Sequence, residues 1–509
     1  MAFNSLAFAL FLPIVFVLYW LLLGRNHKSQ NAMLLVASYL FYGWWDWRFC
    51  GLLLATTLIA YFCALAPRRR KFWAGVSVVS NLLILGLFKY FNFFSENLQR
   101  LFSTFGFALD WFTIEILLPV GISFYTFQAI SYSVDAYRGR IEPTRDFVAF
   151  ALFVSFFPQL VAGPIERSTS LLPQFLKPRT WNYHEGVEGL RLILWGLFKK
   201  CVVADGMAYW VDLAYDFHAG GGSLYDSLCA TIGALGFAIQ IYGDFSGYSD
   251  IAKGSAKLLG IRLMDNFLYP FFSRNAIELW QRWHRSLMQW LREYVYFPLG
   301  GSRRGNRYWH AFVVFLVSGL WHGASWNFVV WGILCGVWYI IAVLAGARKY
   351  RPTDDAPASR RDLPKCVATF LLFSLVFIFF RAESLSQAVD LCLTGAPLGL
   401  ATAAAMLVVA WIVSRLRFSF GWLPWAAVAL CVIGCLVAPR TAVPALLGFA
   451  PFVFAALLMW VEWRHRTSHF ALESMPRRRW VRVAVYVGLY LLVVTGAMES
   501  SGAFIYFKF

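Results

Sequence analysis

Two histidines are the side chains of this sequence best suited to chemistry. His322 lies in the uncharged run 308–346, which is too long for one membrane span and has no polar loop where two spans would join. Four small residues around it predict a break in the helix: Ser318, Gly319, Gly323 and Ser325. Irregular backbone at membrane depth survives only where protein or a water-filled cavity surrounds it. The pattern therefore predicts a buried break that carries a titratable imidazole; the alternative is a histidine that only hydrogen-bonds two helices.

His284 lies in segment 278–301, which is too charged to cross a bilayer and predicts one helix along the membrane interface. At 100° per residue, one arc of this helix is apolar: Trp280, Trp283, Leu287, Trp290, Leu291 and Tyr294. The opposite arc is polar: Gln281, Arg282, Arg285, Gln289 and Arg292. A plain membrane-surface helix would explain both arcs. It would not explain His284 at the edge of the apolar arc, so we expect His284 to face the protein and Arg282 to serve surface attachment.

A third polar group stands at the end of an apolar run in segment 240–257. It contains Asp244 and Ser249 beside Lys253 and Lys257, and a capped helix junction is the plain alternative. The candidates for donor or substrate binding are Asp244, Ser249, Trp283, Arg285, Trp321 and Asn327. Segment 163–175 and the pair Lys199 and Lys200 are weaker candidates for holding a phosphate-bearing group.

The elements that must position these residues are membrane helices. The chain has 509 residues, 60% hydrophobic and 14% charged, against roughly 25% charged in soluble domains. Apolar runs long enough to span recur throughout, giving about eleven to thirteen candidate spans and an all-α, polytopic integral membrane fold with interfacial and re-entrant helices. The first run, 3–23, lacks the marks of a signal peptide and is interpreted as a retained helix.

The positive charge of the chain is explained by topology. The net charge is +18, but the basic residues stand in short clusters between apolar runs, which argues against nucleic acid. The clusters at 25–28, 68–71, 348–365 and 464–479 are predicted to be cytoplasmic, whereas 205–226 and 383–397 are predicted to be external. The cysteines form no pattern typical of disulfides or of a metal site.

The chain is predicted to be a single domain, 1–509. Its motifs concentrate in about 115–346, and the Pro-containing linker 348–365 separates them from plain apolar C-terminal helices, about 365–509. We find no internal repeat, which weakens a transporter built from inverted repeats. No Walker A loop, GxSxG elbow or HExxH helix is present, so a histidine-centred transfer remains.

The motifs together resemble the membrane-bound O-acyltransferase family. The resemblance rests on LPVGISFYTFQAISYSVDAYRG at 118–139, DFSGYSDIAKG at 244–254, WQRWHRSLMQWLREYVYFPLGG, SGLWHGASWNFVVWG and the closing FIYFKF. It is closest to a bacterial branch that contains the alginate O-acetylation membrane subunit and, less similar in wording, the teichoic-acid D-alanyl transfer protein. The resemblance implies a ring of tilted helices around a central funnel, with His322 as the catalytic histidine and His284 as the second histidine.

The resemblance also implies a function. Members of this branch take an acyl group from a cytoplasmic thioester, with acetyl-CoA as the donor in alginate-like members, and hold no bound cofactor. The group passes across the bacterial inner membrane, where periplasmic or membrane-anchored partner proteins complete its transfer to an exported polysaccharide. Two alternatives stay open: a polysaccharide or lipid transporter, and a lipid-directed O-acyltransferase. Paired histidines without inverted repeats favour the enzyme.

Overall fold

The computed structural model describes residues 1–24, 26–106, 118–216, 223–347, 357–415 and 443–499. The described residues form helices and no strands. The N-terminal helices are α1 (Leu6–Val17), η1 (Leu18–Leu22), α2 (His27–Gly43), α3 (Arg48–Leu65), α4 (Arg70–Leu85), η2 (Gly86–Tyr90), α5 (Phe91–Thr104), α6 (Ile122–Tyr137), α7 (Phe147–Ser155), α8 (Phe157–Leu160) and α9 (Leu172–Phe175).

The central helices are α10 (Tyr183–Leu197), η3 (Phe198–Ala204), α11 (Asp205–Asp216), α12 (Leu224–Leu258), η4 (Pro270–Phe272), α13 (Ala276–Arg282), α14 (Arg285–Leu291), η5 (Arg292–Tyr296), α15 (Arg307–His322) and α16 (Trp326–Leu344). The C-terminal helices are η6 (Arg360–Asp362), α17 (Leu363–Arg381), α18 (Leu385–Arg415), α20 (Val443–Arg464) and α21 (Arg479–Glu499).

The expected all-α, multi-pass membrane architecture is confirmed. The described residues contain 7 helices that are long and apolar enough to cross a bilayer, and two shorter apolar helices at 6–22 and 147–160. The predicted spans, about eleven to thirteen, refer to the whole chain. Within the described residues, several apolar runs form short or interrupted helices such as α7 and α8. The predicted orientation stays a prediction, and Gly220 to Gly222, residues 348–356 of the linker and the closing FIYFKF motif lie outside the described residues.

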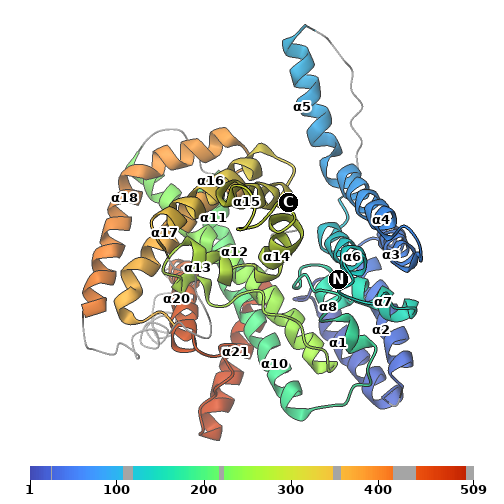
Figure 1. The fold of residues 1–509 in the computed structure, drawn as a ribbon. Coiled ribbons are helices and arrows are strands. Elements are labelled where there is room, and N and C mark those ends of the chain that lie inside the picture. The colour runs from blue at the N-terminus through green and yellow to red at the C-terminus, as the bar shows by residue number, and fades with distance from the viewer. Residues whose placement is uncertain (25, 107–117, 217–222, 348–356, 416–442, 500–509) are drawn as a thin grey trace.

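Two groups of buried apolar side chains make up the interior. One draws on α1–α4 and α6–α9 together with Phe245, Leu287 and Trp321. The other draws on α10–α18, α20 and α21 and includes Trp280 and Trp331. In Figure 1 the helices of the first group lie on one side and those of the second on the other, with α12 and α14 between them. Residues of the predicted site therefore lie where the two groups meet.

The predicted break in the run 308–346 and the predicted continuous helix over 278–301 have different outcomes. The break in the run 308–346 is confirmed, because α15 ends at His322 and α16 begins at Trp326. The single interfacial helix over 278–301 is wrong, because α13 ends at Arg282 and α14 begins at Arg285. Between them His284 adopts a left-handed conformation with φ of 42°, which a side chain with a Cβ rarely adopts. Helical phase therefore does not carry over from Arg282 to His284.

Glycine allows α10 and α12 to cross at backbone contact. A Cβ added at Gly196 would lie 2.5 Å from the carbonyl oxygen of Gly247, and one added at Gly247 would lie 2.6 Å from that of Gly196. About two turns farther along each helix, Gly189 and Gly254 approach each other in the same way. Small residues of this kind let membrane helices approach closely. This crossing fixes α12, which carries Ser249 and Phe245.

We therefore expect Gly247→Ala to destabilise the protein by about 1–3 kcal/mol, because its Cβ meets backbone that has no room to move. The matched control is Gly51→Ala in α3, where an added Cβ meets nothing within 4 Å. Thermal unfolding of both variants in detergent measures the difference. Equal midpoints for the two variants would contradict the close crossing.

Candidate active site

His322 is the last residue of α15, and its ring is enclosed by aromatic side chains. The ring centroid lies 4.9 Å from Trp321, 5.1 Å from Trp331 and 5.1 Å from Phe380. The ring of His284 lies 6.3 Å away, centroid to centroid. Both histidines are buried, at 6% and 2% exposure. The structure thus brings together the two imidazoles that the sequence placed 38 residues apart by number, 284 and 322.

The C-terminal end of α15 is held by side chains from the N-terminal part of the chain. Lys89 Nζ donates to the carbonyl oxygens of Trp321 at 2.7 Å and His322 at 3.0 Å. The hydroxyl of Tyr90 donates to the carbonyl of Leu320 at 2.6 Å. The last carbonyls of a helix have no partner within it, so these contacts satisfy the end of α15 and fix the position of His322.

Asn266 fixes the orientation of His284. The Nδ1 atom of His284 lies 3.0 Å from Asn266 Oδ1, while the amide nitrogen of Asn266 donates to Ser249 Oγ at 3.2 Å. Ser286 Oγ also donates to Asn266 Oδ1, at 2.9 Å. Because an amide oxygen only accepts, this network assigns the ring proton to Nδ1. Nε2 is then an acceptor, and it is buried without a hydrogen-bonding partner among the described residues.

The loop 261–269, which contains Asn266, satisfies backbone groups at the break between α13 and α14. The Leu268 N–H donates to the Arg282 carbonyl at 3.0 Å, and the Arg285 N–H donates to the Asn266 carbonyl at 2.9 Å. A left-handed residue such as His284 costs about 1–3 kcal/mol and persists where its surroundings over-determine it. Here the backbone pairing and the imidazole contact both hold His284 in place.

Three of the sequence-predicted binding residues lie at or near this centre, and of these three Trp321 touches the histidines directly. Trp321 contacts both histidine rings, with centroids 5.7 Å from His284 and 4.9 Å from His322. Ser249 reaches His284 through Asn266. Asp244 lies inside α12 and forms an ion pair with Lys200 at 2.7 Å, while its neighbour Phe245 packs on His284.

The plain alternative for segment 240–257, a capped helix junction, is wrong, because α12 continues without interruption to Leu258.

The other three lie farther from the histidines. Trp283 is buried among Phe267, Phe271 and Phe373 rather than against either imidazole. The amide of Asn327 donates to the carbonyl of Ala382 at 2.5 Å, tying α16 to the end of α17. Arg285 is partly exposed beside Asp265 and lines a cavity described below.

The weaker phosphate candidates are engaged with carboxylates. Lys199 pairs with Asp250 at 2.6 Å, and Lys200 pairs with Asp205 at 2.7 Å. In segment 163–175, Arg167 pairs with Glu293. Their charges are thus already balanced within the protein, which disfavours a phosphate-binding role for them.

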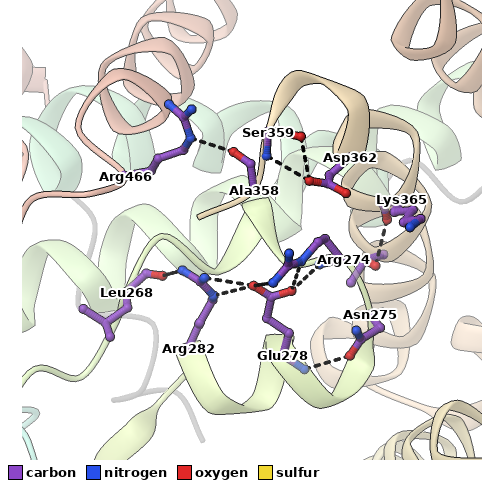
Figure 2. Close-up of polar contacts among 11 residues, drawn as sticks. Leu268, Arg274, Asn275, Glu278, Arg282, Ala358, Ser359, Asp362, Lys365 and Arg466 are labelled. Atoms are coloured by element: carbon purple, nitrogen blue, oxygen red, sulfur yellow. Dashed lines mark hydrogen bonds and ion pairs between the residues drawn. The ribbon is translucent and has the colours of Figure 1, made fainter. Parts of the chain in front are cut away.

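The expectation that Arg282 lies on the surface is wrong. Arg282 is 4% exposed and pairs with Glu278 at 2.8 Å, and Arg274 pairs with the same carboxylate at 2.9 Å. Figure 2 shows this group, with Arg282 also donating to the Leu268 carbonyl at 3.1 Å. Removing one partner of a buried ion pair is strongly destabilising. Loss of Arg282 would therefore damage the fold around the break and not membrane attachment.

Two cavities flank the histidine pair. A small one, about 50 Å³, is lined by His322, Trp321, Lys89 and the start of α6. A larger one, about 430 Å³, lies between α13, α14 and the pair α15 and α16, and its lining includes Trp280, Arg282, Arg285 and Arg292. Trp280 packs on Trp331 with centroids 6.0 Å apart, and Trp331 packs on His322. A layer of aromatic rings thus stands between the larger cavity and the imidazole. A central funnel around them stays a prediction.

Sequence reasoning missed Asn266, Lys89 and Glu278. Asn266 stands in a loop without a recognisable pattern, and its role comes only from its contacts with residues of two helices. Lys89 had a signal, because a lysine within an apolar run is costly and often functional.

Comparison with known protein families shows the family to which this chain belongs. Residues 76–362, more than half of the chain, match the membrane-bound O-acyltransferase family. The chain belongs to this family and is a membrane O-acyltransferase.

Relatives of known name indicate the branch. The "Probable alginate O-acetylase AlgI" of Azotobacter vinelandii is 40% identical over 400 residues, covering 76% of each chain. The "Peptidoglycan O-acetyltransferase" of Helicobacter pylori is 34% identical over 419 residues, covering 74% of this chain and 76% of that protein. The "Teichoic acid D-alanyltransferase" of Bacillus subtilis is 26% identical over 227 residues, covering 42% of this chain and 56% of that protein. The resemblance to the alginate O-acetylation branch is confirmed.

We expect Asn266→Ala to lower acyl transfer about 10–100-fold, by analogy with the loss of outer-shell partners of functional histidines. The reason is that His284 then loses the acceptor that fixes its ring proton. Asn266→Asp keeps that acceptor and should retain more activity. The measurement is transfer activity at matched membrane abundance, and equal activity of Asn266→Ala and the unmodified protein would refute the positioning role.

Proposed function

We propose that this enzyme takes an acetyl group from acetyl-CoA at the cytoplasmic face of the bacterial inner membrane and passes it outward for O-acetylation of an exported polysaccharide such as alginate. Partner proteins in the periplasm or anchored in the membrane would complete the transfer to the polymer. The observation that carries the proposal is the buried pair His284 and His322, 6.3 Å apart between ring centroids.

The proposed chemistry follows from the two imidazoles. His322 accepts the proton of an acceptor hydroxyl while that oxygen attacks the thioester carbonyl carbon. His284 presents Nε2 as an acceptor and orients a substrate group, since its Nδ1 proton is engaged by Asn266. As the thiolate leaves, the proton returns to the sulfur. The aromatic surroundings exclude water, and water would otherwise hydrolyse the thioester donor.

The relatives support acetyl as the transferred group. Two of the similar proteins are named for acetyl transfer, one to alginate and one to peptidoglycan. The identity to the alginate O-acetylases extends over 76% of this chain, which favours an exported polysaccharide over a lipid acceptor.

We propose the larger cavity as the donor site. Its volume of about 430 Å³ lies within the roughly 300–1,000 Å³ that is typical of small-molecule sites. The guanidinium groups of Arg285 and Arg292 suit phosphates, and the apolar wall of Trp280 and Phe315 suits the uncharged arm of a thioester donor. The basic loop that follows, with Arg303, Arg304 and Arg307, favours the cytoplasmic side for its entrance.

We expect His322→Ala to abolish polymer acetylation and acetyl-CoA consumption while membrane abundance stays nearly unchanged, and His284→Ala to impair both strongly. The matched control is His310→Ala, because His310 lies on the same helix and is also 6% exposed. Acetyl content of the polymer and acetyl-CoA consumption by membranes are measured together. A well-expressed His322→Ala variant with normal acetylation would exclude the catalytic role, and acetyl groups found on lipid would exclude the polysaccharide acceptor.

We further expect Arg285→Ala to raise KM for acetyl-CoA about tenfold with a smaller effect on kcat, because a charge-assisted phosphate contact contributes about 1.5–3 kcal/mol at most. Arg262→Ala is the control, since Arg262 is 75% exposed and pairs with Glu185 outside the cavity. An unchanged KM in Arg285→Ala would remove the donor from this cavity.

A further inference from the structure

Lys89 is an unusual residue for its position. It lies in η2, within the stretch Arg70–Thr104 that is long and apolar enough to cross a membrane. A charged side chain inside a membrane helix is costly and is kept for a reason. Other lysines of the interior, such as Lys199 and Lys200, are paired with carboxylates. Lys89 instead donates to two backbone carbonyls and forms no ion pair within the described part of the chain.

The contacts of Lys89 leave part of its donor capacity unused. An ammonium group carries three N–H donors and no acceptor. Two are directed to the carbonyl oxygens of Trp321 and His322. The third has no acceptor among the described residues, and the Nζ atom also lies 6.0 Å from the centre of the Trp321 ring.

The cavity of about 50 Å³ joins Lys89 to His322. Both residues line it, together with Trp321 and the first residues of α6, Ile122 and Ser123. It exceeds the roughly 10–15 Å³ that one water requires, so it admits a group of the size of an acetyl. The positive end of the α6 dipole adds to the positive potential of the ammonium group at this cavity. A carbonyl oxygen that gains negative charge would be stabilised here.

We propose that Lys89 stabilises the oxyanion of the tetrahedral intermediate in acyl transfer. This inference rests on the proposed acetyl transfer at His322. The acceptor oxygen forms a bond to the thioester carbon, its proton moves to His322, and the carbonyl π electrons move to oxygen. The alkoxide accepts the third N–H of Lys89. When the alkoxide re-forms the carbonyl, the C–S bond breaks, and the thiolate takes the proton from His322.

The alternative is that Lys89 only caps α15. Tyr90 provides the comparison, because its hydroxyl caps the same helix end through the carbonyl of Leu320 and Tyr90 is not among the residues that line the small cavity. Lys89→Met removes the charge at similar length, Lys89→Arg keeps the charge, and Tyr90→Phe removes one capping bond alone. A loss specific to charge at Lys89 separates oxyanion stabilisation from capping.

The experiment uses the full chain in lipid nanodiscs and two CoA thioethers. S-(2-oxopropyl)-CoA mimics the ground state, whereas S-(3,3,3-trifluoro-2-oxopropyl)-CoA hydrates and ionises to mimic the oxyanion. We expect Lys89→Met to weaken binding of the fluorinated analogue about 100-fold, in line with the loss of one oxyanion donor, with little change for the other. Tyr90→Phe should weaken both less than about fivefold, and Lys89→Arg should recover part of the loss.

Polymer acetylation in cells is measured in parallel at matched abundance, and it should fall with binding of the fluorinated analogue. Equal affinity of Lys89→Met and the unmodified protein for the fluorinated analogue overturns the role of Lys89. Equal losses in Lys89→Met and Tyr90→Phe overturn it in favour of capping. If the unmodified protein binds neither analogue and consumes no acetyl-CoA, the proposed donor itself is wrong, and the inference about Lys89 falls with it.

Discussion

The carbonyl groups at the end of α15 impose the constraint on which the site depends. A helix that ends inside a membrane leaves its last carbonyls without water, and each unsatisfied group costs several kcal/mol. Lys89 and Tyr90 supply the donors from a segment more than 200 residues earlier in the chain. Because these contacts hold the end of the helix, His322 stands at a fixed place between the two groups of buried aromatic side chains.

A comparable arrangement holds the second histidine. The break at His284 exposes backbone groups that the loop around Asn266 satisfies, and the Asn266 amide also orients the imidazole. Before the break, the one carboxylate of Glu278 accepts from both Arg274 and Arg282, so each of these two guanidinium groups has a charged partner (Figure 2). Paired charges of this kind cost less than isolated ones in a buried setting. The end of α15 and the break at His284 are therefore both held by hydrogen bonds from outside their own helices.

The distribution of positive charge separates two functions within this enzyme. Lys199 and Lys200 are neutralised by carboxylates of α11 and α12 and hold helices together. Arg285 and Arg292 face a cavity that is large enough for a small molecule. Lys89 is directed to helix carbonyls beside the cavity of His322. The sequence presents all of these residues as basic positions near apolar runs, and only their partners distinguish them.

The sequence by itself determined the membrane class, the all-α fold and the break after His322. These follow from composition, from run length against bilayer thickness and from small residues at the break, all of which are local properties. The tertiary structure decided that segment 278–301 breaks at His284, that Arg282 is buried and that α12 runs through Asp244 without a junction. Helical periodicity predicts positions on the assumption that the helix continues. The left-handed conformation of His284 ends that regularity. The contacts that hold His284 in this conformation come from Asn266, which lies 18 residues earlier in the chain. The roles of Asn266 and Lys89 likewise depend on long-range hydrogen bonds, which local sequence does not encode.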